Sequence, residues 1–173
     1  SAEIVRLRQI NDQLTQELNK VALARPPGSE TLAKGDDQVE LAFTVTLTDR
    51  RKGYPYQPYR VSGSRVFTLK ELLIACGPYL LSESKLSNVK SALNRAIKDK
   101  SLEEITEAYP DLEIGTATIQ ERSLQLVIVQ FAALGYIQIS TSRDDSGKET
   151  RVAVLTSVGR SELVSASAVR RGL

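Results

Sequence analysis

Few side chains in this sequence are suited to catalysis. The 173 residues include no His, and the single Cys, Cys76, falls in the apolar stripe of a predicted helix. His is the most common general base and metal ligand, and a thiol needs a nearby base or positive charge to become reactive. One Cys also allows neither a Cys-rich zinc site nor an internal disulfide. We therefore interpret Cys76 as a small buried apolar residue.

Three pairs of adjacent carboxylates offer the other conceivable chemistry. The pairs Asp36-Asp37 and Asp144-Asp145 lie where a linker and a turn are predicted, and such residues are ordinary there. The pair Glu103-Glu104 suits the first turn of a helix. None of them completes a metal or acid–base set, so we expect no catalytic residue, no metal site and no cofactor.

Basic and aromatic residues are the best candidates for binding. Five basic residues between positions 49 and 65 accompany only one acidic residue, Asp49, and three Tyr lie among them. Cations can hold phosphates while aromatic rings stack on bases. The alternative is a solvated loop whose Tyr rings cover the end of a sheet. The candidates are Arg50, Arg51, Lys52, Tyr54, Tyr56, Tyr59 and Arg60, with Lys90 and Lys98 from one predicted helix and Gln120 and Arg122 from another.

Charge and hydropathy exclude some other classes of protein. The 23 Lys and Arg against 21 Asp and Glu leave a formal charge of +2, which does not by itself imply a polyanionic partner. No apolar run approaches the roughly 18 residues of a membrane span, and no signal peptide is recognisable. We expect a cytoplasmic protein without membrane contact. Because the chain has no Met, we also expect it to be part of a longer protein.

The first residues repeat with alternating spacings of three and four, which predicts a coiled-coil helix over residues 1–24. Asn11 occupies an a position, and a buried Asn favours a parallel, in-register dimer. Glu3 and Arg8 are correctly placed and signed for an ion pair between the two helices. The alternative is an amphipathic helix that packs on its own domain. The predicted seam consists of Ile4, Leu7, Asn11, Leu14, Leu18 and Val21.

A Pro-Pro-Gly sequence ends this helix, and residues 25–37 are predicted to be a linker. The domain then spans residues 38–173. Strict alternation of apolar and polar residues from Val39 to Thr48 predicts a strand, and a second extended segment over 59–67 can return beside it. These two segments predict a β-hairpin with a long tip.

Helical periodicity follows the hairpin. A capping box at Thr68 and Glu71 predicts a helix over 69–81, and apolar spacing from Leu86 to Ile97 predicts a second. The acidic stretch 101–113 separates them from a second capping-box pattern at Thr118 to Glu121. That pattern predicts a third helix over 119–134, whose second half, 126–134, we expect to be buried on nearly all sides.

The remaining elements resemble the winged-helix family of helix-turn-helix domains. Residues 136–140 and 151–155 predict two strands around a turn, and a last helix begins near Leu155. The segment 131–137 is similar to a recognition helix entering the wing, and residues 155–160 carry a Leu-Thr-x-x-Gly-Arg motif. The resemblance implies an α+β fold. The extra N-terminal hairpin departs from a minimal winged helix and could add its strands to the sheet of the wing.

A narrower resemblance covers the whole chain. The heptad helix, the Pro-Pro-Gly linker, Gly35-Asp36-Asp37, the hairpin and the Gly77-Pro78-Tyr79-Leu80 segment are similar to the C-terminal region of certain bacterial proteins. Their uncharacterised N-terminal domain is similar to nucleoside deoxyribosyltransferase and Toll/interleukin-receptor folds. The resemblance implies a role in defence or signalling, with any catalytic activity upstream of Ser1.

Two functions remain open. In winged-helix docking the first half of the recognition helix enters the major groove. Here its candidates, from Thr118 to Gln125, carry no net charge, and neither does the predicted wing over 143–151. Because duplex binding depends on neutralising phosphates, we favour a non-enzymatic homodimer that binds a protein partner or senses a ligand for the missing N-terminal domain. The alternative is a nucleic-acid-binding module that uses the hairpin tip and the second helix.

Overall fold

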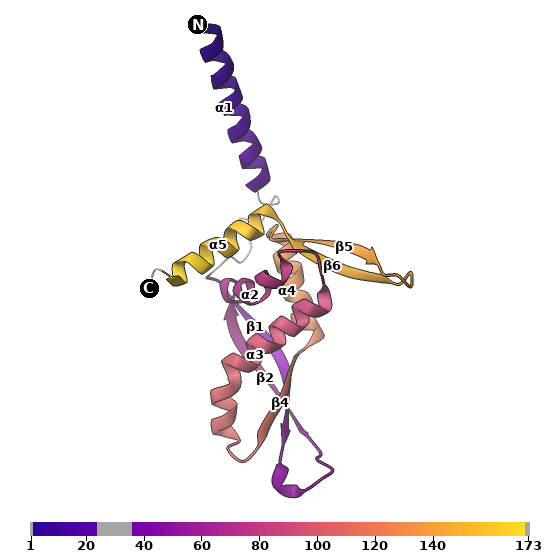
Figure 1. The fold of residues 1–173 in the computed structure, drawn as a ribbon. Coiled ribbons are helices and arrows are strands. Elements are labelled where there is room, and N and C mark those ends of the chain that lie inside the picture. Colours follow the sequence, from indigo (N-terminus) through magenta and orange to yellow (C-terminus); the bar gives the residue numbers. More distant parts are fainter. Residues whose placement is uncertain (1, 24–35, 172–173) are drawn as a thin grey trace.

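The structure, a computed structural model, describes the backbone of residues 2–23 and 36–171 and the side chains of residues 2–13 and 36–168. These residues form an α+β fold with five α-helices and two antiparallel three-stranded sheets (Figure 1). The predicted first helix is α1 (Ala2–Leu23). Most of the predicted linker 25–37 lies outside the described residues.

The first sheet has the strand order β2-β1-β4. In it β1 (Gln38–Thr48) pairs with β2 (Tyr59–Thr68), which confirms the predicted hairpin. Successive side chains of a strand point to opposite faces, so the alternating residues of β1 divide into a buried and a half-exposed set. The buried set is Leu41, Phe43, Val45 and Leu47. At the tip, a single 3-10 turn, η2 (Arg50–Lys52), leads into the loop before β2.

The third strand, β4 (Glu113–Ile119), corrects the sequence prediction. Thr118 does not cap a helix but lies in β4 opposite Thr44. The residue before the next helix is Gln120, whose side chain makes no capping hydrogen bond. A register shift opposite Val45 and Leu47 interrupts the alternation of buried and exposed residues in β4. The strand forms because β1 has a free edge with which it can pair. The second capping box was therefore a wrong prediction.

The capping box at Thr68 is confirmed. The Glu71 backbone N–H donates to Thr68 Oγ1 at 3.1 Å, and the Thr68 N–H donates to Glu71 Oε1 at 3.2 Å. It opens α2 (Leu69–Cys76), which continues into the 3-10 turn η3 (Gly77–Leu80). The next helix, α3 (Leu86–Ala108), extends through most of the acidic stretch that was predicted to follow it.

The second sheet contains β3 (Ser84–Lys85), β6 (Glu149–Leu155) and β5 (Ile137–Arg143), in that order. The predicted pair of strands and the turn between them are confirmed. The N-terminal hairpin does not join this sheet, so the expectation that it could extend the wing was wrong. The hairpin instead forms the first sheet with β4, which pairs with β1 on the side away from β2.

The helix α4 (Glu121–Ala133) is fixed to the first sheet at its N-terminal end. The Gln120 N–H donates to the Ala42 carbonyl at 2.9 Å, and the Ala42 N–H donates to Ser123 Oγ at 2.9 Å. Leu126 and Val129 on this helix are 49% and 62% exposed, which contradicts the prediction that residues 126–134 are buried on nearly all sides.

The last helix, α5 (Ser157–Arg171), begins at the Leu-Thr-x-x-Gly-Arg motif. Thr156 Oγ1 accepts the Gly159 N–H at 3.0 Å and donates to the Gly135 carbonyl. A Cβ atom at Gly159 would lie 2.0 Å from the Tyr136 carbonyl oxygen. Arg160 Nη2 donates to the Leu81 carbonyl at 2.8 Å. Each polar or small position of the motif therefore holds α5 against the rest of the domain.

Candidate interaction surfaces

The described part of the predicted seam on α1 is open. Ile4 and Leu7 are 54% and 61% exposed, and Asn11 is also exposed. Leu14, Leu18 and Val21 belong to α1, but their side chains lie outside the described residues. The side chains of Ile4, Leu7 and Asn11 are therefore exposed on the heptad face of α1, and the pairing of that face with another chain stays a prediction.

Two further apolar side chains of α1 were missing from the predicted seam. Val5 and Ile10 are 53% and 42% exposed. In the heptad register Ile10 takes a g position, beside Asn11, and would flank the seam. In the sequence, only its apolar character could have pointed to Ile10, because this residue does not fall on the alternating spacing of three and four.

The hairpin tip is less basic than its sequence indicated. Arg50 Nε lies 2.5 Å from Glu113 Oε2, and Arg51 Nη1 lies 3.5 Å from Asp111 Oδ2. Both carboxylates come from the acidic stretch 101–113, which the sequence left without basic partners. The fold brings the two segments together because β4 starts beside the end of β1.

Asp49 organises the base of the tip. Its carboxylate accepts hydrogen bonds from the Arg51 side chain at 3.0 and 3.1 Å and from the Arg51 N–H at 3.1 Å. The bonds from the Arg51 side chain hold the pKa of Asp49 below its usual value. Lys52 donates to the Tyr59 hydroxyl, and its Nζ lies 5.0 Å from the centroid of that ring. Among the described residues, Arg60 is the tip cation without an ion pair or hydrogen bond.

The three Tyr of the tip differ in their surroundings. Tyr54 is 88% exposed, and its ring meets that of Tyr56 edge to face with centroids 5.8 Å apart. Tyr59 lines a cavity of about 410 Å³ with apolar residues of β1, β2 and the segment after α3. Tyr59 borders this cavity and is itself 43% exposed, whereas Tyr54 projects into solvent.

The candidates on the helices lie together, away from the tip. Asn94 Oδ1 accepts the Ile119 N–H at 2.7 Å, which places α3 beside the end of β4 and the start of α4. Lys98 lines an open cavity with Arg95 and Thr118, and Lys90 is half-buried two turns before Lys98. Gln120 and Arg122 are exposed at the start of α4.

These helix residues and the hairpin tip do not form one surface. The start of α4 is bonded to Ala42, whereas the tip follows Thr48 at the other end of β1. Six residues of strand separate these points, a distance of about 20 Å. Figure 1 shows the tip at the far end of the first sheet from α4 and the β5–β6 hairpin.

The outward face of α4 is apolar beyond its first turn. Leu126 and Val129 are neighbours on the helix surface at i and i+3, and both are exposed. Arg122 and Gln125 precede them, and the Gln125 side chain donates to Glu121 at 3.0 Å. Contiguous apolar side chains at the surface are typical of protein contacts rather than of phosphate contacts.

Cys76 and the carboxylates are the side chains that the sequence offered for catalysis. Cys76 is fully buried, and this burial raises the pKa of its thiol to about 12. In the described ranges, no three His, Cys, Asp or Glu side chains lie close enough to share a metal ion. None of the described helices has both the length and the apolar character needed to cross a membrane.

Comparisons with known proteins found no similarity. No protein family, no curated protein and no solved structure matches this chain.

Proposed function

We propose that this chain is a dimerisation and partner-binding module of a larger bacterial protein that acts in defence or signalling. The observation that carries the proposal is the exposure of Ile4 and Leu7 on a heptad-patterned helix. An isolated amphipathic helix of this length gains little from local interactions and is stabilised mainly by packing. A second copy of α1 supplies a matching apolar seam and ion-pair partners for Glu3 and Arg8.

We further propose that the domain is winged-helix-like. The support is topological: α2 precedes β3, the helices α3 and α4 lie between β3 and β5, and the strand order is β3-β6-β5. That arrangement resembles a winged helix. The insertion of β4 between α3 and α4, and its pairing with the N-terminal hairpin, distinguish this domain from a minimal one.

A protein partner is favoured over a nucleic acid by two features. The basic tip residues Arg50 and Arg51 already pair with Glu113, Asp49 and Asp111. The proposed recognition helix presents Leu126 and Val129 to solvent. Neither feature matches a surface built to neutralise phosphates.

Disulfide trapping tests the parallel dimer. Leu7 occupies a d position, where the two helices of a parallel dimer bring equivalent residues together. Under mild oxidation the Leu7→Cys variant should form a covalent dimer. Gln9→Cys provides the matched control, because position f faces away from the seam. Cys76 should not interfere, since it is buried. A monomeric mass for the unmodified chain, with equal cross-linking of both variants, would reject the parallel dimer.

Nucleic-acid binding remains the second candidate, favoured by the cavity between α3 and β4. That cavity is lined by Arg95 and Lys98, by one acidic residue, Asp99, and by hydroxyl groups, and Lys90 and Arg122 lie on the same two helices, α3 and α4. Fluorescence anisotropy of labelled duplex DNA and single-stranded RNA, at about 50 and 200 mM salt, measures the affinity of the chain for nucleic acid. Sub-micromolar, salt-sensitive binding that is lost in the triple variant Lys90→Ala, Lys98→Ala, Arg122→Ala would reverse our ranking.

A further inference from the structure

In the described part of the chain, no strand pairs with the outer edge of β2. The Leu69 N–H donates to the Asp37 carbonyl at 3.1 Å, which extends the register that pairs Gln38 with Thr68. Hydrogen-bonded pairs alternate along an antiparallel ladder, so the odd-numbered residues of β2 bond to β1. The even-numbered residues then direct their N–H and C=O groups outward.

A second contact agrees with this assignment. The Val66 carbonyl accepts a hydrogen bond from Lys100 Nζ at 2.6 Å, and Lys100 lies on α3, outside the strand ladder. The next outward-facing residues are Ser64, Ser62 and Arg60. No strand among the described residues pairs with them. The opposite edge of the sheet differs, because Asn94 of α3 binds the Ile119 N–H of β4.

An apolar groove accompanies the open edge. One cavity of about 160 Å³ is lined by β1, by Val61 and Gly63 of β2, and by the end of α3. A second, of about 410 Å³, continues from it toward the tip. Both are bordered by Leu47, Val61 and Tyr109, so they form one groove between β2 and the end of α3.

Gly63 lies in the middle of this groove, and the Phe43 ring of β1 packs against it. A Cβ atom at Gly63 would lie 3.2 Å from Phe43 Cζ, so the Phe43 ring lies directly beside the glycine. Unpaired strand edges bind other strands readily, and large side chains on a neighbouring strand can cover a glycine at an edge. Phe43 already covers Gly63 from β1, and an apolar side chain on an added strand, opposite Gly63, would lie in the apolar groove that Phe43 lines.

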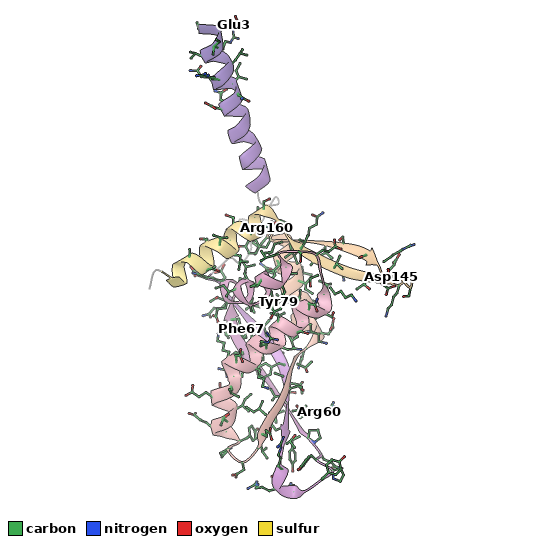
Figure 2. The ribbon with its side chains drawn as sticks, viewed as in Figure 1. Glu3, Arg60, Phe67, Tyr79, Asp145 and Arg160 are labelled. Carbon is green, nitrogen blue, oxygen red and sulfur yellow. The ribbon has the colours of Figure 1, made fainter. Side chains whose placement is uncertain are left out.

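Arg60 places a positive charge at the end of the β2 edge that lies near the tip. Arg60 has no ion pair or hydrogen bond among the described residues, and its backbone is on the outward-facing side of β2. Figure 2 shows Arg60 toward the tip and Phe67 toward the other end of the strand. A carboxylate on a neighbouring strand, directly opposite Arg60, would complete a cross-strand ion pair.

We propose that β2 binds an extended peptide from a partner protein, which adds to the first sheet as a fourth strand. The peptide carries apolar side chains at alternate positions, about 7 Å apart, over Gly63 and Val61, and an acidic side chain opposite Arg60. The peptide backbone bonds to the outward groups of Ser62 and Ser64. The inference deepens the partner-binding part of the proposed function and does not depend on the α1 seam.

A designed peptide tests this geometry. The probe is fluorescein-labelled Thr-Thr-Thr-Phe-Thr-Leu-Glu-Thr, which in antiparallel register places Phe opposite Gly63, Leu opposite Val61 and Glu opposite Arg60. N-methylation of its fifth residue removes the N–H that points toward Ser62. N-methylation of its fourth residue alters an N–H that points away from β2. We expect anisotropy to show saturable binding to the full chain, weakened at least tenfold by the first modification and much less by the second.

Two substitutions in the chain supply the matched test. Ser62→Pro removes an outward-facing N–H, which an edge strand tolerates, whereas Ser62→Ala keeps it. Peptide affinity should fall at least tenfold in the first variant and remain within about twofold in the second. If circular dichroism shows that Ser62→Pro does not fold, the comparison of the two N-methylated peptides on the unmodified chain tests the proposal instead.

Other outcomes overturn the proposal. No binding at about 1 mM peptide, or equal binding of the two N-methylated peptides, would reject strand addition. A lower oligomeric mass for Ser62→Pro than for Ser62→Ala would assign the edge to a second copy of the chain. Cross-linking of Leu7→Cys reports on α1 separately, so the dimer can stand or fail independently of the peptide site.

Discussion

Arg50 Nε lies 2.5 Å from Glu113 Oε2, so the first residue of β4 forms an ion pair with the first residue of η2 in the hairpin tip. The two residues are 63 positions apart in the sequence, one in a basic segment and the other in an acidic segment, so neither segment by itself shows the ion pair. When only the charged residues of the tip sequence are counted, the tip is a basic cluster. The folded tip is a set of ion pairs in which Arg50 and Arg51 are both partnered.

Removing the carboxylates that pair with Arg50 and Arg51 should leave the tip with more unpaired positive charge. The double variant Asp111→Asn, Glu113→Gln raises the formal charge from +2 to +4, because it removes two carboxylates. Since both ion pairs are largely exposed, unfolding free energy should change by less than about 1 kcal/mol. Affinity for single-stranded RNA should rise and become more salt-dependent in anisotropy titrations. Glu103→Gln, Glu107→Gln matches the charge change on α3, and an equal rise there would exclude a specific role for the tip.

The contact between Ser123 and Ala42 should contribute to stability. Ser123 is buried, and its Oγ accepts the Ala42 N–H of the central strand. Ser123→Ala leaves that N–H without its partner, so unfolding free energy in urea should fall by about 1–3 kcal/mol. Ser91→Ala is the control, because Ser91 is exposed and bonds within its own helix. Equal small losses in both variants would show that α4 does not rely on this bond.

Gly159 should tolerate no side chain. The Cβ of Gly159→Ala would lie 2.0 Å from the backbone oxygen of Tyr136, and backbone cannot move away without disturbing β5. We expect a loss of about 3 kcal/mol or more by thermal or urea unfolding. Ser161→Ala, an exposed change in the same turn of α5, should cost little. A stable Gly159→Ala variant would contradict the close approach of α5 to Tyr136.

Glu71 should make stability depend on acidity. Burial alone would raise the pKa of Glu71, but hydrogen bonds from Lys100 and Thr68 outweigh it, so the pKa falls below the ordinary value of 4.5. A carboxyl with a lower pKa in the folded state stabilises the fold above its unfolded pKa and loses that contribution as pH falls through the folded pKa. Glu71→Gln keeps a capping side chain but removes the charge.

Urea unfolding at several pH values measures this effect. At pH 7 the unmodified chain should be more stable than Glu71→Gln, and the difference should shrink as pH decreases below 4.5. Because the pair with Lys100 is partly exposed, the difference should stay below about 1 kcal/mol. A difference that does not change with pH would assign the effect to packing rather than to the carboxylate charge.

Local patterns in the sequence determined much of the secondary structure. The alternation along β1, the capping box at Thr68 and the turn between β5 and β6 depend on neighbouring residues, and all three were predicted correctly. The heptad of α1 is likewise local, although its pairing with another chain remains a prediction. These features were readable because their physical causes lie within a few residues.

Only the tertiary structure decided the features that depend on distant partners. Residues 113–119 form a strand because β1 has a free edge, so Thr118 lies in a ladder instead of capping a helix. Leu126 and Val129 stay exposed because α4 contacts the domain through its other face. Arg50 is paired because β4 places Glu113 beside it. Each outcome depends on a contact between segments far apart in the chain, and no local pattern encodes which partner will be near.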